Sequence, residues 1–82
     1  MKLIEEVKNE KYTMYKIEGS QMMKVYADHE KNEYTLAYGK VAIERNGTAE
    51  KEEIEGILNA RWVDIIIETG LAIKNWMENN KE

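Results

Sequence analysis

The chain has no cysteine and no long apolar run, and each absence excludes a class of protein. Without cysteine, neither a disulfide framework nor a thiolate zinc site can hold the fold together, so side-chain packing must suffice. No stretch reaches the roughly 18 apolar residues of a membrane span, and the first ten residues lack the apolar run of a secretory signal. We therefore expect a cytoplasmic protein without a membrane partner, located in the host cytoplasm if a phage encodes it.

Positive charge is also scarce. Twelve basic residues against sixteen acidic ones give a formal net charge of −4, which argues against direct nucleic-acid binding through a broad basic surface. A protein partner with a basic surface fits this balance better. The 82 residues, 43% of them hydrophobic, suit one folded domain that spans residues 1–82.

Short amphipathic patterns fill the first half of the chain. Leu3, Ile4 and Val7 recur at helical spacing, which predicts a short amino-terminal helix, with an opening strand as the alternative. The segments YTMYKI, MMKVYA and YTLAY are rich in tyrosine, methionine and β-branched residues, and turn residues bound them, so they predict three strands. The segment KVAIER after Gly39 is either a fourth strand or a continuation of the third through a bulge. Their short connections favour an antiparallel sheet.

The second half has a helical pattern. Thr48 is placed to cap a helix, and Glu50, Glu52 and Glu53 suit the positive end of its dipole. At 100° per residue, the apolar side chains from residue 54 to residue 77 occupy an arc of about 220°, wider than one core face needs. We expect either two helices, with a break at Gly70 or near Asn59, or one long helix that pairs with a second chain. A buried strand at residues 65 to 67 is a further alternative.

The fold class that follows is α+β. It comprises a short amino-terminal helix, an antiparallel sheet of three to four strands, and one long or two shorter carboxy-terminal helices that cover one face of the sheet. The wide apolar arc also predicts a homodimer formed through the carboxy-terminal helical region.

Catalytic and cofactor sites have little support. Ser20 and His29 could act as nucleophile and base only if the fold brought them together beside a third orienting group. Asp28, His29 and Glu30 are adjacent, and neighbours in an extended segment point to opposite sides, which suits a solvated turn better than a metal site. The glycines are isolated, so no phosphate-binding loop is indicated. We expect no catalytic residues, no metal and no cofactor.

One resemblance to other proteins indicates a function. The segments LIEEVKNEKYTMYKIEG, KNEYTLAY and GILNARW, between residue 3 and about residue 62, follow one another in an order that resembles a family of small acidic anti-CRISPR proteins of Listeria prophages. Those proteins inhibit the type II CRISPR effector nuclease by mimicking DNA. The resemblance implies a helix, a three-stranded antiparallel sheet and two helices.

The resemblance also implies which residues bind the partner. Glu30, Asn32 and Glu33 match acidic and amide residues that the family directs at the basic pocket reading the short DNA motif beside the target. Glu10 adjoins Lys11, which stands where the family has an aspartate. Apart from the resemblance, Glu50, Glu52, Glu53 and Glu55 form the densest acidic group in the chain, which suits either a helix start or an acidic patch that contacts lysine and arginine side chains of a partner.

Two functions are therefore expected. The first is a phage-type inhibitor that binds a nucleic-acid-binding enzyme, such as a CRISPR effector nuclease, and is not itself an enzyme. The alternative is a structural or assembly accessory protein that self-associates through its apolar carboxy-terminal helix.

Overall fold

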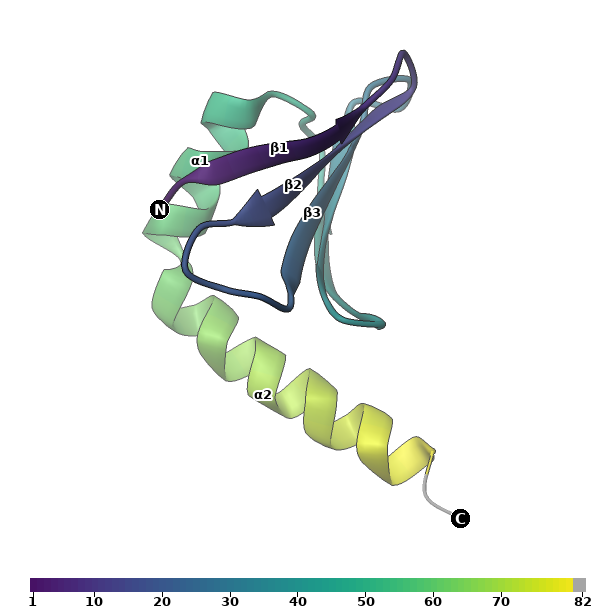
Figure 1. The fold of residues 1–82 in the computed structure, drawn as a ribbon. Coiled ribbons are helices and arrows are strands. Elements are labelled where there is room, and N and C mark those ends of the chain that lie inside the picture. The colour runs from purple at the N-terminus through teal and green to yellow at the C-terminus, as the bar shows by residue number, and fades with distance from the viewer. Residues whose placement is uncertain (81–82) are drawn as a thin grey trace.

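The computed structural model describes residues 1–80 as five strands followed by two helices (Figure 1). The elements are β1 (Leu3–Lys8), β2 (Tyr12–Ile17), β3 (Met23–Asp28), β4 (Glu33–Tyr38), β5 (Val41–Asn46), α1 (Lys51–Ala60) and α2 (Trp62–Asn79). The strands form one antiparallel sheet in the order β1-β2-β3-β4-β5, so each strand pairs with its neighbour in the chain. The α+β class is confirmed, with five strands instead of three or four.

The prediction of an amino-terminal helix is wrong, and so is the corresponding part of the architecture that the resemblance implies. Residues 3 to 8 form the edge strand β1, in which Leu3 pairs with Ile17 and is buried. A bulge between Glu5 and Val7 shifts the register, so the segment lacks a simple period of two. Leu3, Ile4 and Val7 are spaced as on one face of a helix. In the edge strand, however, only Leu3 is buried and Ile4 and Val7 are exposed, so this spacing does not mark a buried face.

A tight turn at Gly39 makes β5 a separate strand. Gly39 has a φ of 58°, in the left-handed region that glycine adopts without a steric penalty. Two residues, Gly39 and Lys40, therefore connect β4 to β5, and the chain reverses there. Of the two alternatives for the KVAIER segment, the separate strand is correct.

The helical region breaks near the earlier of its two candidate positions. Helix α1 ends at Ala60 and α2 begins at Trp62, so the break falls at Arg61, two residues beyond Asn59. Gly70 lies inside α2 without interrupting it, and residues 65 to 67 are helical, so neither a break at Gly70 nor a strand there is present.

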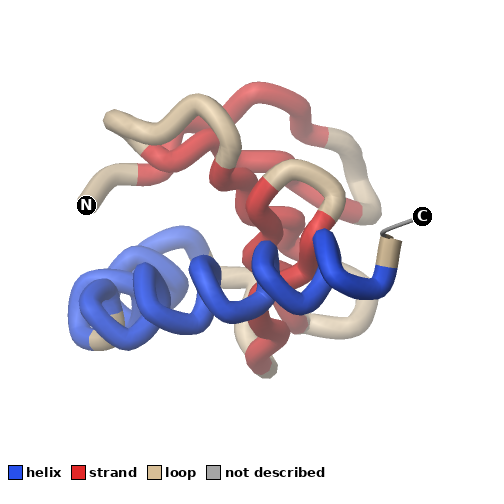
Figure 2. Tube along the Cα trace, turned by 90° about the horizontal axis from the view of Figure 1, so that it is seen from below, coloured by secondary structure: helices blue, strands red, loops and turns tan. Residues whose placement is uncertain are grey.

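Both helices lie on one side of the sheet (Figure 2). The core between the two layers contains buried residues from all strands but β5, from the segment before α1, and from both helices: Leu3, Tyr15, Ile17, Met23, Val25, Ala27, Tyr34, Leu36, Ala49, Ile54, Leu58 and Ile65. Beyond this core α2 continues below the sheet (Figure 1), where Ile73 and Trp76 line a pocket with Met22 from the β2–β3 turn and Val41 at the start of β5. The long helix gives the molecule extents of 40 × 25 × 22 Å.

Candidate interaction surfaces

One end of the sheet gathers most of the carboxylates expected to bind a partner. The β1–β2 turn, with Glu10, and the β3–β4 turn, with Glu30, lie there together, and the backbone N–H of His29 donates a hydrogen bond to the carbonyl of Lys11 at 2.7 Å. Both glutamates are exposed. Lys11 and Lys31 occupy the same turns, so this surface, which we call the sheet end, is mixed in charge.

Asn32 and Glu33 have intramolecular roles at the sheet end. Asn32 has a φ of 51°, and its Oδ1 accepts a hydrogen bond from the backbone N–H of Ala49 at 3.2 Å. This hydrogen bond therefore holds the β3–β4 turn against the segment that leads into α1. Glu33 is half-buried and pairs with Arg45 at 3.6 Å. These contacts fix the shape of the sheet end and leave Glu10 and Glu30 as its exposed carboxylates.

The start of α1 adds Glu50 and Glu53, both exposed. Thr48 does not cap the helix as the sequence predicted, since Glu50 is the cap residue and no side chain caps the helix. Instead, Thr48 is buried, and its Oγ1 accepts a hydrogen bond from the backbone N–H of Glu50 at 3.1 Å. Thr48 thus stabilises the turn that immediately precedes α1.

The structure separates the serine from the histidine. Ser20 lies in the β2–β3 turn, at the opposite end of the sheet from His29, and six-residue strands of about 20 Å lie between them. Ser20 Oγ accepts a hydrogen bond from Met23 N–H, and His29 Nε2 shares one with the buried Thr13 at 2.7 Å. Both residues therefore stabilise turns. Within residues 1–80, no group of three or more acidic or histidine side chains is placed to hold a metal ion.

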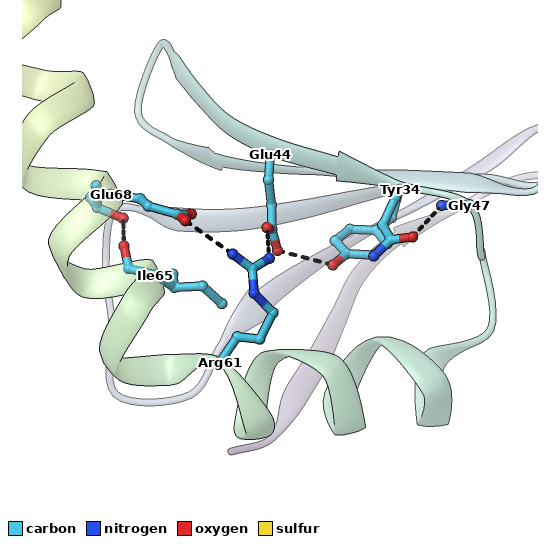
Figure 3. Close-up of polar contacts among 8 residues, drawn as sticks. Tyr34, Glu44, Gly47, Arg61, Ile65 and Glu68 are labelled. Carbon is cyan, nitrogen blue, oxygen red and sulfur yellow. Dashed lines mark hydrogen bonds and ion pairs between the residues drawn. The ribbon is translucent and has the colours of Figure 1, made fainter.

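A polar network that sequence reasoning missed joins the sheet to the helix break (Figure 3). The Arg61 guanidinium donates hydrogen bonds to Glu44 on β5 and, at 3.0 Å, to Glu68 on α2. The Tyr34 hydroxyl donates to the other oxygen of Glu44 at 3.2 Å. The hydrogen bond to Glu44, together with its charge, raises the pKa of Arg61 above its usual value. Arg61 thus holds the break between α1 and α2 against the sheet.

The phenol of Tyr34 provides a test of this network. Its side chain is 0% exposed, and desolvation together with the charge of Glu44 raises its pKa to about 12. Because the pKa is higher in the fold than in the unfolded chain, the neutral phenol stabilises the fold fully below pH 10 and less as the pH rises to 12. We expect a loss of about 2 kcal/mol over this interval.

Urea unfolding of the wild type and of Tyr34→Phe, measured at intervals from pH 9 to pH 12, isolates this contribution. The phenylalanine variant should lose less stability over the interval, because it has no proton to release at this position. Parallel curves for the two proteins would contradict the proposed titration.

Helix α2 has a second, outward apolar face. Its inward side packs through Ile65, which is 0% exposed, and through Thr69, whose hydroxyl donates to the carbonyl of Ile65 at 2.6 Å. At 100° per residue, eight exposed residues fall within about 140° on the other side, and we call them the α2 outer face. They are Val63, Ile66, Ile67, Gly70, Leu71, Lys74, Met77 and Glu78.

The α2 outer face accounts for the wide apolar arc in the sequence. Val63 is 71% exposed and Leu71 62%, so the sheet does not cover these side chains. A shallow groove of about 550 Å³ lies along this side of α2 and is lined by Gly70, Ile73, Lys74, Met77 and Glu78. One core face and one exposed face together produce the 220° arc.

No family model, no curated protein and no solved structure matches this chain. The resemblance to the anti-CRISPR family therefore stays a prediction. In the part of the chain from residue 1 to residue 80, no helix is both long enough and apolar enough to cross a membrane.

Proposed function

We propose that this protein acts by binding another protein and that the α2 outer face is its main binding surface. The observation that carries the proposal is a continuous set of exposed aliphatic side chains on a helix whose opposite side is already packed in the core. Monomeric proteins rarely expose contiguous apolar patches of this kind unless the patch binds something. An apolar helix face that fits a groove or a second helix is a common form of protein recognition.

A second candidate is inhibition of a nucleic-acid-binding enzyme through the sheet end, as the anti-CRISPR resemblance implies. In its favour, the fold brings Glu10 and Glu30 to one end of the sheet and exposes both carboxylates. Exposed carboxylates can form charge-assisted hydrogen bonds with the lysine and arginine side chains of a DNA-binding pocket. The basic residues at the same end weaken the likeness to DNA, so we rank this function second.

Two double variants separate the surfaces. Ile66→Glu with Ile67→Glu places charge on the α2 outer face, and Glu10→Ala with Glu30→Ala removes charge from the sheet end. Because all four side chains are exposed, thermal melts of both variants at low micromolar concentration should stay close to that of the wild type. In-cell cross-linking followed by mass measurement should show complexes that the first variant loses and the second retains.

The second candidate function has its own readout. If the sheet end acts as the resemblance implies, added wild-type protein should block target cleavage by a type II CRISPR nuclease, and the Glu10→Ala, Glu30→Ala variant should not. Full cleavage in the presence of the wild type would remove this candidate. Cross-linked complexes that are insensitive to the α2 double variant would contradict the main proposal.

A further inference from the structure

We infer that the α2 outer face binds the α2 outer face of a second copy of this chain, with the two helices antiparallel and crossing at Gly70. This inference rests on the proposed function, because it names the partner of the same surface. It names a second copy of the chain as the partner, makes the two helices antiparallel and places their crossing at Gly70.

Gly70 is the first reason for choosing a second helix as the occupant. A glycine in an exposed helix interior costs about 1 kcal/mol relative to alanine. The folded chain gives no reason for it, since a Cβ at Gly70 would meet no atom within 4 Å and no positive φ is present. Two helices that cross at this position would give a reason, because the missing side chain lets their backbones approach closely.

The spacing along α2 is the second reason. Val63, Ile66, Gly70, Ile73 and Met77 follow the alternating three-residue and four-residue steps of a helix-pairing seam. Gly70 also lies at the middle of α2, which runs from residue 62 to residue 79. A twofold axis at Gly70 therefore superimposes the two helices over their whole length and places Val63 of each copy opposite Met77 of the other.

Charge selects the antiparallel direction. Lys74 and Glu78 are the charged residues of the α2 outer face, and a parallel pair would set each of them beside the same residue of the second copy. In the antiparallel pair Lys74 lies opposite Ile66 of the second copy, with Asp64 of that copy within reach on the same flank. Glu78 lies at the level of Trp62 of the second copy, away from the second Glu78. The like-charge contact of Lys74 in the parallel arrangement thus becomes an attraction between opposite charges.

The area is sufficient for a weak, specific dimer. Complete burial of an aliphatic side chain removes on the order of 100 Å² from water. The five aliphatic residues of the α2 outer face are each more than half exposed, which offers roughly 300 Å² per copy. Homodimer interfaces are about 65% apolar, so the pair would bury roughly 900 to 1,000 Å² in total, near the lower limit for a specific interface. We therefore expect dissociation in the micromolar range.

Sedimentation equilibrium over a range of concentrations tests the interface. Gly70→Leu should weaken dimerisation at least tenfold, because the new side chain blocks the crossing, while it leaves the fold of each copy intact. Gly56→Leu is the matched control, since Gly56 is also an exposed helical glycine with open space around it but lies on α1. Dimerisation that is unaffected by Gly70→Leu, or weakened equally by Gly56→Leu, would overturn the inference.

Disulfide trapping tests the direction, and the absence of native cysteine makes it specific. A mixture of the Val63→Cys and Met77→Cys variants should form the mixed disulfide under mild oxidation. Each variant alone should link to itself far less. Self-linked Val63→Cys as the main product would indicate a parallel pair and overturn the antiparallel register.

The oligomeric state and the in-cell cross-links together distinguish this inference from the proposed function. A chain that stays monomeric at every concentration, yet loses its in-cell complexes in the Ile66→Glu, Ile67→Glu variant, would overturn the inference and leave the proposed function in place. A monomer whose complexes are unaffected by that variant would overturn both.

Discussion

Replacing Ile65 by alanine is expected to lower the free energy of unfolding by about 2–5 kcal/mol, whereas the same change at Ile66 should alter it by less than about 0.5 kcal/mol. The two isoleucines are neighbours in the same helix. Ile65 is 0% exposed and belongs to the core between α2 and the sheet, whereas Ile66 is 53% exposed on the α2 outer face. Truncation leaves a cavity only at Ile65.

Urea unfolding monitored by circular dichroism, at a protein concentration below that of dimerisation, measures both effects. Because the substitution and its intrinsic helix propensity are the same at the two positions, the difference between the variants reports burial alone. Equal losses at the two positions would show that the outer face is covered within a single copy. At higher protein concentration the Ile66→Ala variant should have a lower free energy of unfolding than the wild type, since a dimer stabilises the fold by mass action.

Replacing Glu44 by alanine is expected to lower the free energy of unfolding by about 2 kcal/mol. This carboxylate accepts hydrogen bonds from both Tyr34 and Arg61, and its side chain is only 13% exposed. The substitution leaves the hydroxyl of a fully buried tyrosine without this acceptor, and an unsatisfied buried donor costs about 1–3 kcal/mol. Glu68, whose bond to Arg61 is more exposed, should contribute much less when replaced.

A double-mutant cycle with Tyr34→Phe checks the cause. In the phenylalanine background there is no hydroxyl to leave unsatisfied, so Glu44→Ala should cost at least 0.5 kcal/mol less than in the wild type. Additive losses would show that Glu44 acts through other contacts. The measurement is again urea unfolding, at pH 7, where the phenol is neutral.

The sequence predicted the strands from β2 to β4 and offered a helix break near Asn59 as one alternative, because in these segments the local pattern and the tertiary environment agree. In β2, for example, Thr13, Tyr15 and Ile17 are buried and alternate with more exposed neighbours. The amino-terminal strand could not be predicted in this way. It is an edge strand with a bulge, so Leu3 is buried while Ile4 and Val7 are exposed, and no period of two remains.

The candidate surfaces differ in how much of each could be predicted from the sequence. The wide apolar arc predicted that the carboxy-terminal helical region would have more apolar surface than one sheet covers, and Val63, Ile66, Ile67 and Met77, which lie in that arc, are exposed. The network of Tyr34, Glu44 and Arg61 left no signal, because its members are 10 and 17 residues apart and meet only through the fold. Likewise, the contact of Asn32 with Ala49 was invisible in the sequence.

The order of the strands has a consequence for the speed of folding. Because every strand pairs with its neighbour along the chain, the sheet can grow by the addition of one hairpin at a time, and each addition closes only a short loop. Mixed proteins with such local pairings fold faster than sandwiches with distant ones. The chain also contains no proline, so slow cis–trans isomerisation of prolyl bonds cannot delay the last steps. The fold can therefore form soon after the chain leaves the ribosome.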